Sequence, residues 1–326
     1  MLYPLRFQPI FRHYLWGGHR LARELGKTVP AEQTCAESWE IVDRGVDQSH
    51  VAFGGLRGAS LGELTSQFGR ELLGRHDPLP RFPLLFKYLD AEQTLSVQVH
   101  PSDAYAAQLD PPDLGKTEAW VVLSAEPSSR IYAGLRPGID RQQFVTAIRE
   151  GRVETTLHAF HPRNGDCVFL PSGIMHALGG GLLVAEIQQS SDATFRVFDW
   201  NRVGPDGTPR PLHIEQALAV TNFGAGPIEP IRASHEPATS QSGLWREELV
   251  RCDKFVLERW QVHDRVDLET GDRFHLLAVL EGAVELIGDP AQAPLGRGQT
   301  ALWPACLPRL SLIPRVPSTL LLVCLP

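Results

Sequence analysis

The chain has few of the features that mark a secreted, membrane or nucleic-acid-binding protein. Only five cysteines occur in 326 residues, and none has the spacing of a zinc knuckle: they stand at positions 35, 167, 252, 306 and 324. Free thiols in a reducing cytoplasm are therefore expected. No run of about 18 apolar residues could span a membrane, and residues 1–7 lack the apolar core of a signal peptide. The formal net charge of −7 and pI near 5.9 argue against nucleic-acid or acidic-membrane partners.

Turn-forming residues, in contrast, are abundant. The 29 glycines and 26 prolines are spread along the chain, which favours many short strands joined by turns. Helical signals are few. Ser60 and Glu63 form a capping box that predicts a helix through Leu72, Asp140 is expected to cap a second helix, and residues 214–220 predict a third. The chain is 43% hydrophobic and can bury a sizeable core, so a mainly β fold with a few short helices is expected.

One segment carries a pattern of glycine, proline and histidine. Gly165 is followed after five residues by Pro171, after one more by Gly173 and after two more by His176. Glycine and proline at these places predict a turn, a short strand and a second turn. The second turn would place His176 at the start of the next strand. This spacing is similar to the second signature of a cupin barrel, and the resemblance implies a jelly-roll barrel with an inward-pointing histidine.

An upstream segment supplies partners for this histidine. Residues 95–100 alternate apolar and polar side chains, as in a half-buried strand. The polar side chains on one face are Ser96, Gln98 and His100. Glu118 begins another predicted strand. The candidate metal ligands are therefore Gln98, His100, Glu118 and His176. Nitrogen and oxygen ligands of this kind suit a divalent transition metal, zinc first, with a position open for water or substrate. Gln98 is either a ligand or a group that hydrogen-bonds to one.

The end of the chain repeats part of this pattern. The spacing from Gly298 to Pro304 equals that from the first glycine to the first proline above, and residues 274–282 resemble a first cupin signature. No histidine follows Pro304, and His275 has no evident partners. Residues 224–241 are rich in Gly, Pro, Ala and Ser and are interpreted as a linker. Two cupin-type barrels are thus expected: a metal-binding catalytic domain with helical additions over 1–235, and a barrel without metal over 236–326.

Several longer segments resemble the short bacterial class of type I mannose-6-phosphate isomerases. They are residues 16–18, 37–40, 88–103, 115–120 and 183–200. The resemblance is close from about residue 5 to 223 and loose beyond. It implies a zinc-dependent aldose–ketose isomerase that interconverts mannose 6-phosphate and fructose 6-phosphate, with one Zn²⁺ per chain. It also implies that the metal ligands are the four named above and that Arg196 is the catalytic arginine.

The chemistry of such a reaction suggests further residues. Moving a carbonyl between C1 and C2 requires removal of a proton beside it and stabilisation of the resulting enediolate. Arg196, with its permanent charge, can stabilise the developing oxyanion. A carboxylate or a lysine can carry the proton. The candidates, which the sequence does not rank, are Glu186, Asp192 and Lys116. The candidates for binding the substrate phosphate are Ser96, Lys87 and Lys116.

Two other functions suit a metal-binding cupin: a non-catalytic regulatory protein that binds a sugar phosphate, and an iron-dependent oxygenase. Arg196 and Lys116 beside the full ligand set argue against the first. An amide in place of a histidine argues against the second. The expected partner is a small-molecule sugar phosphate, and the chain is expected to be a cytoplasmic monomer or homodimer of carbohydrate metabolism.

Overall fold

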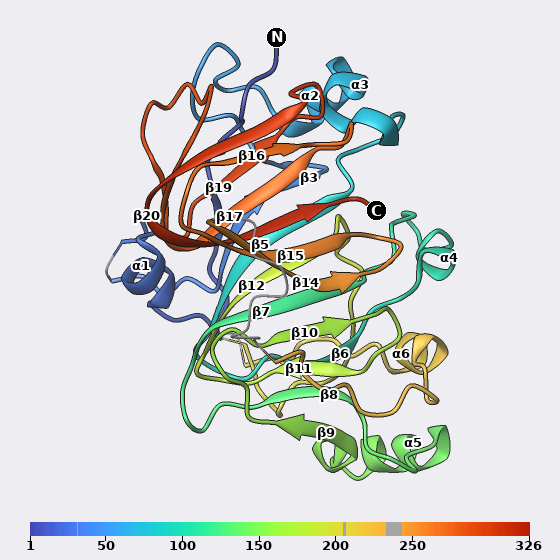
Figure 1. Ribbon diagram of the computed structural model, residues 1–326. Coiled ribbons are helices and arrows are strands. Elements are labelled where there is room, and N and C mark those ends of the chain that lie inside the picture. The colour runs from blue at the N-terminus through green and yellow to red at the C-terminus, as the bar shows by residue number, and fades with distance from the viewer. Residues whose placement is uncertain (31, 205–206, 233–242) are drawn as a thin grey trace.

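The computed structural model describes residues 1–30, 32–204, 207–232 and 243–326. Three antiparallel β-sheets are packed in succession (Figure 1), and short helices lie at their edges. The mainly β prediction is therefore confirmed. No helix among the described residues is long and apolar enough to cross a membrane.

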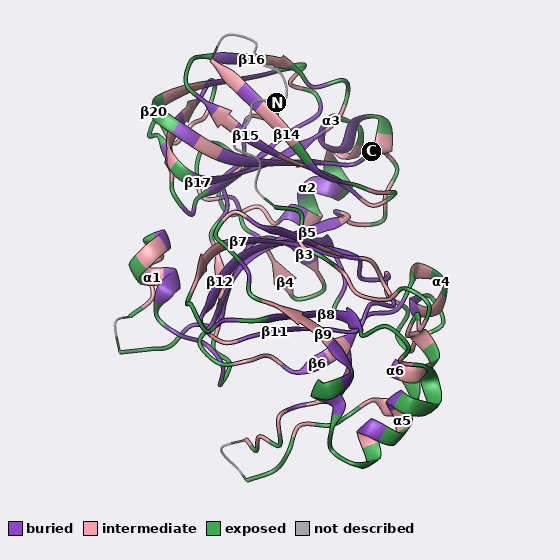
Figure 2. Ribbon diagram, turned by 60° about the horizontal axis from the view of Figure 1, so that its bottom comes forward, coloured by how far each residue is buried: buried purple, intermediate pink, exposed green. Residues whose placement is uncertain are grey.

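The first sheet is the central layer. Its six strands, in spatial order, are β1 (Ile10–Arg12), β2 (Glu37–Ile41), β5 (Leu84–Ala91), β12 (Leu182–Gln189), β7 (Glu118–Ala125) and β10 (Cys167–Leu170). Every residue of β5 and β12 is buried, because other sheets cover both faces (Figure 2). Side chains alternate between these faces along a strand. Ala185 and Ile187 consequently join the core shared with the C-terminal sheet, while Glu186 between them points to the opposite side.

The second sheet covers that opposite side. Its five strands are β13 (Phe195–Phe198), β6 (Val97–Val99), β11 (His176–Leu178), β8 (Ile131–Leu135) and β9 (Leu157–Phe160). Trp120 and Val184 of the first sheet share one apolar cluster with Ile131 and Leu178 of the second. This cluster fills one part of the space between the sheets and leaves the remainder for polar side chains.

The third sheet is formed by the end of the chain. Its strands are β14 (Leu244–Arg251), β15 (Val256–Val262), β16 (Val266–Glu269), β17 (His275–Leu286), β18 (Leu295–Gly296), β19 (Thr300–Trp303) and β20 (Arg309–Cys324). It has its own apolar cluster, which includes Trp260 and Leu277. Its other face contributes Leu276 and Leu321 to a core shared with the first sheet. Because the sheets share this core, two separate cupin barrels are not confirmed, and a domain boundary at 235/236 stays a prediction.

Pairing between distant segments also joins the two ends of the chain. Leu5 forms a β-bridge with Leu302 of β19. Part of the predicted linker is likewise held in place, since Pro227 pairs with Gly134 and Ile231 with Cys167. Residues 233–241 of that linker lie outside the described residues. All five cysteines are free, as predicted.

Two of the helices follow the predicted capping signals, and the third predicted helix, over 214–220, is also present. The helices are α1 (Arg20–Leu25), α2 (Leu61–Gln67), α3 (Gly69–Leu73), α4 (Asp103–Ala106), α5 (Arg141–Arg149) and α6 (Ile214–Val220), with 3-10 turns at Gly74–His76 and Val153–Thr156. A separate two-stranded hairpin consists of β3 (Asp43–Arg44) and β4 (Asp47–Gln48). Ser60 and Asp140 each form a complete capping box, before α2 and α5 respectively. The predicted single helix through Leu72 is wrong in one detail: the backbone leaves the helical region at Phe68, which divides it into α2 and α3.

Candidate metal centre and active site

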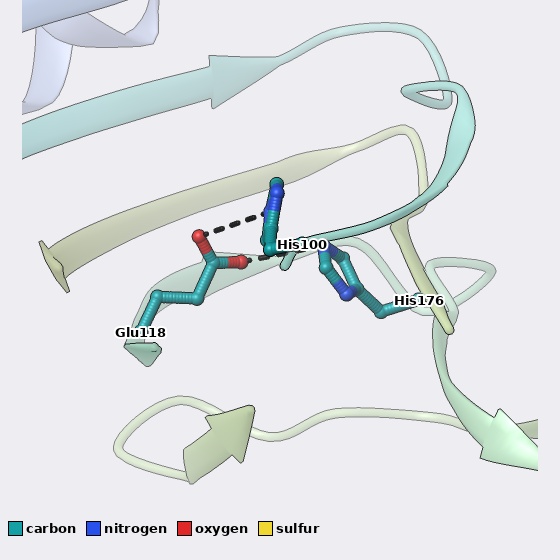
Figure 3. Close-up of side chains that lie close together, drawn as sticks. All are labelled: His100, Glu118 and His176. Carbon is teal, nitrogen blue, oxygen red and sulfur yellow. Dashed lines mark ion pairs between the residues drawn. The ribbon is translucent and has the colours of Figure 1, made fainter. Parts of the chain in front are cut away.

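Three strands bring the candidate metal ligands together. His176 begins β11 and lies opposite Gln98 of β6, while Glu118 begins β7 in the facing sheet. His100 directly follows β6, which is shorter than the predicted strand 95–100. In Figure 3 the Glu118 carboxylate points at both imidazoles. The ligand atoms of these two histidines and the glutamate all lie within 4.8 Å of one another, and all three residues are buried.

The hydrogen bonds of the imidazoles orient them for metal binding. His100 Nδ1 lies 3.0 Å from the carbonyl oxygen of Ala193, and His176 Nδ1 lies 2.9 Å from that of Ile174. A carbonyl only accepts, so each Nδ1 must carry the proton and donate it. The unprotonated Nε2 atoms then point towards Glu118, and this is the usual arrangement of a metal-binding histidine.

The two Nε2 atoms and the Glu118 carboxylate oxygens are all acceptors, and they lie opposite one another. His176 Nε2 is 3.3 Å from Glu118 Oε1, and His100 Nε2 is 3.5 Å from Glu118 Oε2. Burial lowers the pKa of both imidazoles, that of His100 to about 3 with a contribution from the Lys116 charge. Burial alone would raise the pKa of Glu118, but Lys116 and His100 more than offset it and lower it well below its usual value. Two neutral imidazoles and an ionised carboxylate that converge in this way are a typical ligand set, so the residues fit a divalent metal.

Two further observations support this fit. Glu118 Oε1 is buried and has no hydrogen-bond partner. The Lys116 ammonium already lies on the acceptors, 2.7 Å from Glu118 Oε2 and 3.1 Å from His100 Nε2. The cluster therefore attracts positive charge and still has an unsatisfied oxygen. Unpartnered buried carboxylate oxygens are costly, and a metal ion would satisfy this one.

Gln98 lies beside the cluster. Its Nε2 is 3.4 Å from His176 Nε2, and its Oε1 accepts a hydrogen bond from Ser96 at 3.4 Å. Rotation of the amide by 180° would exchange these two atoms and turn the oxygen towards the metal ligands. Gln98 thus has the position required of a ligand or of a hydrogen-bonding neighbour.

A cavity of about 320 Å³ opens next to the cluster and contains Gln98 and Glu118 in its wall. Glu186 of β12 also lines it. Its Oε2 accepts a hydrogen bond from Trp120 Nε1 at 3.1 Å, while its buried Oε1 has no hydrogen-bond partner and lies 3.4 Å from Lys87 Nζ and 3.8 Å from Lys116 Nζ. Burial raises the pKa of Glu186 to about 7, although Lys87 opposes the rise.

Lys87 is held by carboxylates on both sides. Its Nζ lies 3.4 Å from an oxygen of Glu37 and 3.4 Å from one of Glu186. Burial alone would lower the pKa of Lys87, but Glu186, Glu37 and Glu118 more than offset this and raise it. The Lys87 ammonium therefore stays protonated and adds a positive charge to the cavity wall.

Arg196 of β13 lines another wall of the same cavity. Its Nε donates to Ser96 Oγ at 3.1 Å and its Nη1 to the Pro211 carbonyl at 3.1 Å. Burial, and next the charge of Arg210, lower its pKa. Asp192 also lines the cavity but is exposed. Among the described residues, no hydrogen bond or ion pair joins Asp192 to Arg196.

The structure places every predicted site residue at this one cavity or at the metal cluster beside it. The cavity wall also contains residues that were not predicted from the sequence. Further residues in the cavity wall are Tyr14, Glu37, Trp39, Arg44, Gln188 and Arg210. Glu37 and Trp39 belong to a segment that showed the family resemblance, and this resemblance could have indicated a role in the site. No sequence pattern indicated Arg44 or Arg210, because a loop or short hairpin brings each of them to the cavity.

Comparison with known proteins bears on this site. A family model described as phosphomannose isomerase type I, catalytic domain, matches residues 4–119, a range that includes Gln98, His100 and Glu118. The chain is 34% identical to the mannose-6-phosphate isomerase ManA of Bacillus subtilis over 92% of this chain and 93% of that protein. It is 36% identical to the mannose-6-phosphate isomerase of Streptococcus mutans over 93% of each.

Solved structures show the same relationship in three dimensions. The crystal structure of the mannose 6-phosphate isomerase from Bacillus subtilis superposes with a TM-score of 0.88 at 30% identity, covering 99% of each chain. A phosphomannose isomerase from Salmonella typhimurium shares the fold, with a TM-score of 0.75 at 16% identity, covering 99% of each chain.

Proposed function

The chain belongs to the type I phosphomannose isomerases, a family of aldose–ketose isomerases, and from that premise we propose that it interconverts mannose 6-phosphate and fructose 6-phosphate with the help of one bound Zn²⁺. The observation that carries the proposal is the buried cluster of His100, Glu118 and His176 at the edge of a polar cavity. The working compartment that we propose is the cytoplasm.

The proposed metal ligands are the two imidazole Nε2 atoms, the Glu118 carboxylate and the Gln98 amide oxygen. Two neutral imidazoles and one carboxylate are a typical ligand set of catalytic zinc, with a position left for substrate. When bound, the ion supplies a Lewis acid that polarises the oxygens on C1 and C2 of the sugar. The backbone carbonyls of Ala193 and Ile174 keep both imidazoles in the required orientation.

Glu186 is the proposed proton carrier. A carboxylate with a pKa near 7 is well matched to accept and return a proton at neutral pH. Its Oε1 would take the proton from C2 of the open-chain aldose and return a proton to C1, while the hydroxyl proton on O2 moves to O1. Lys116, 3.8 Å from that oxygen, is a second candidate for moving a proton between the sugar oxygens. Asp192 is the weakest candidate, because its exposure keeps its carboxylate hydrated.

Arg196 is proposed to stabilise the negative charge that develops on the sugar oxygens. Ser96 accepts from its Nε and so holds the guanidinium at the cavity wall. The proposed contacts of the substrate phosphate are Ser96, Lys87 and Lys116, which all line the cavity. Lys87 is the weakest of them, because its ammonium is already shared by Glu37 and Glu186.

A coupled assay that follows fructose 6-phosphate formation from mannose 6-phosphate tests the proposal. Untreated protein is compared with protein dialysed against a chelator and with dialysed protein given Zn²⁺ or Fe²⁺. We expect activity to disappear on chelation and to return with Zn²⁺. His176→Ala should abolish both metal content and activity. His161→Ala is the matched control, since His161 Nδ1 also lies near a backbone carbonyl, 2.9 Å from that of Ser129, but does not line the cavity.

Each alternative predicts a different result. A zinc-loaded protein that binds the sugar phosphate without turnover would identify a regulatory protein. Iron with oxygen consumption would identify an oxygenase. Full activity of the chelated His176→Ala protein would refute the metal site itself.

A further inference from the structure

A second polar cavity lies in the C-terminal sheet, far along the chain from the site described above. Its volume is about 300 Å³, which is sufficient for a small metabolite. Five strands and one turn supply its wall: β14, β15, β16, β17, β20 and the turn that follows β16. Its charged and polar residues are Arg246, Arg251, Glu258, Glu269, Thr270, Arg273 and His275.

Strand register explains why these side chains converge. Val256 lies opposite Cys324, and Glu258 lies opposite Leu322. These residues alternate along their strands with residues that face the first sheet, so they share the inner face of the C-terminal sheet. Farther along the same face, Trp260 and Leu277 belong to the apolar cluster of this sheet. The cavity is therefore the polar end of an otherwise apolar interior.

Both carboxylates in the cavity wall already pair with arginines, Glu258 with Arg246 and Glu269 with Arg309. Both oxygens of Glu258 accept from Arg246 Nη2 at 2.8 Å, and one of them also accepts from Trp260 Nε1 at 2.7 Å. The Arg246 guanidinium lies 4.9 Å from the centre of the Trp260 ring. Arg251 pairs with Glu248 outside the cavity wall.

Arg273 and His275, in contrast, lack anionic partners. Arg273 Nη1 reaches only the Cys324 sulfur at 3.8 Å and the Leu325 carbonyl at 3.5 Å. No described carboxylate forms an ion pair with Arg273. Its buried Nε has no hydrogen-bond partner. His275, only 8% exposed, lines the same cavity, and its ring interacts with the backbone of Arg273 but pairs with no described carboxylate. A buried guanidinium N–H is normally satisfied, so the unpartnered Nε of Arg273 in a cavity wall indicates a missing acceptor.

We propose that this cavity binds the oxyanion group of a small metabolite, a phosphate monoester or a carboxylate, through Arg273 and His275. The guanidinium fork of arginine suits both groups, since it can donate two parallel hydrogen bonds to their oxygens. Val256, Leu268 and Leu322 supply an apolar wall for the body of such a ligand. The site is independent of the metal cluster, because it shares no residue with the first cavity.

The test is a titration of the full chain, labelled with ¹³C at histidine, with inorganic phosphate and separately with acetate. The His275 signal, assigned by its absence in His275→Gln, should shift in a saturable manner. The two anions distinguish a phosphate site from a carboxylate site. Signals of His100 and His176 report separately on the first cavity, so failure of this proposal is distinguishable from failure of the proposed isomerase.

Variants make the test specific. Arg273→Gln should weaken the binding seen at His275 by roughly tenfold or more, as expected for the loss of a charge-assisted pair. Arg273→Lys should give an intermediate affinity. If His275→Gln does not fold, the His275 signal is assigned instead as the histidine signal that Arg273→Lys displaces, because both residues line the same cavity. Arg315→Gln is the matched control, because Arg315 is an exposed arginine of β20 paired with Glu285 outside the cavity.

Two results would overturn the proposal. One is a His275 signal that neither anion moves beyond the shift given by sodium chloride of equal ionic strength. The other is an Arg315→Gln protein that loses as much affinity as Arg273→Gln.

Discussion

Replacing Arg196 with alanine should remove turnover while leaving the metal in place. The guanidinium contacts no proposed metal ligand directly. Its link to them runs through Ser96, which accepts from Arg196 Nε at 3.1 Å and lies 3.4 Å from Gln98 Oε1. The Nε and Nη1 groups are occupied by Ser96 and by the Pro211 carbonyl. Among the described residues no partner bonds Nη2, which leaves that group available to the proposed substrate.

The expected magnitude follows from this count of donors. Loss of one preorganised donor to a developing oxyanion typically lowers kcat by about 10²–10³-fold, equivalent to roughly 2.7–4 kcal/mol. Arg196→Ala should therefore lower kcat by about that factor. Arg196→Lys keeps the positive charge but loses the planar fork, and should recover roughly tenfold of the loss. Ser96→Ala removes only one supporting hydrogen bond and should cost about 0.5–1.5 kcal/mol.

The assay combines steady-state kinetics with metal analysis of each purified variant. Arg136→Ala is the control, since Arg136 also donates to a backbone carbonyl, that of Leu157 at 2.9 Å, but does not line the cavity. A kcat of Arg196→Ala within a few-fold of that of the unmodified protein would contradict the proposed role of the guanidinium. Loss of metal from the variant would also contradict it, because the defect would then be structural.

Three further predictions concern a proton carrier, a buried histidine and a helix cap. Glu186→Gln should keep its metal and lower kcat by about 10²–10⁴-fold, the usual contribution of a general base; unchanged kcat would remove Glu186 from the mechanism. Burial, followed by the Arg273 charge, lowers the pKa of His275 to about 4, so the unfolded chain binds more protons than the folded chain between pH 4 and an unfolded pKa of about 6.5. The free energy of unfolding should therefore fall by up to roughly 3 kcal/mol as pH drops through this window. Urea titrations in phosphate-free buffer should show that the free energy of unfolding depends less on pH in His275→Gln than in the unmodified protein. An equal pH dependence in the two proteins would contradict the lowered pKa of His275. Asp140→Ala should lower the free energy of unfolding by about 1 kcal/mol through loss of the α5 cap, whereas Asp140→Ser should lose little of it.

Local sequence patterns were sufficient to predict that His100, Glu118 and His176 lie together. The spacing from Gly165 to His176 encodes two turns and a strand, and these geometries depend on neighbouring residues alone. Alternation along residues 95–100 likewise placed Gln98 and His100 on one face, although the strand itself is shorter. Capping at Ser60 and Asp140 was predictable for the same reason.

Contacts between distant segments were not predictable in this way. The position of Glu186 beside Lys87 depends on the register between β12 and β5, which a single strand pattern does not specify. The bridge from Leu5 to Leu302 and the core shared between the sheets depend on how whole sheets pack. Pro227 and Ile231 of the predicted linker pair with strands of the first two sheets. This pairing was not predicted, because composition indicates where the chain turns but not which distant strand a segment contacts.

X-ray absorption at the zinc edge, on protein of measured metal content, tests the central claim most directly. The account predicts one zinc ion per chain, with nitrogen and oxygen neighbours at about 2.0–2.2 Å, an imidazole signal equivalent to two histidines, and loss of that signal in His176→Ala. A sulfur neighbour at about 2.3 Å, or active protein without a bound divalent ion, would contradict it.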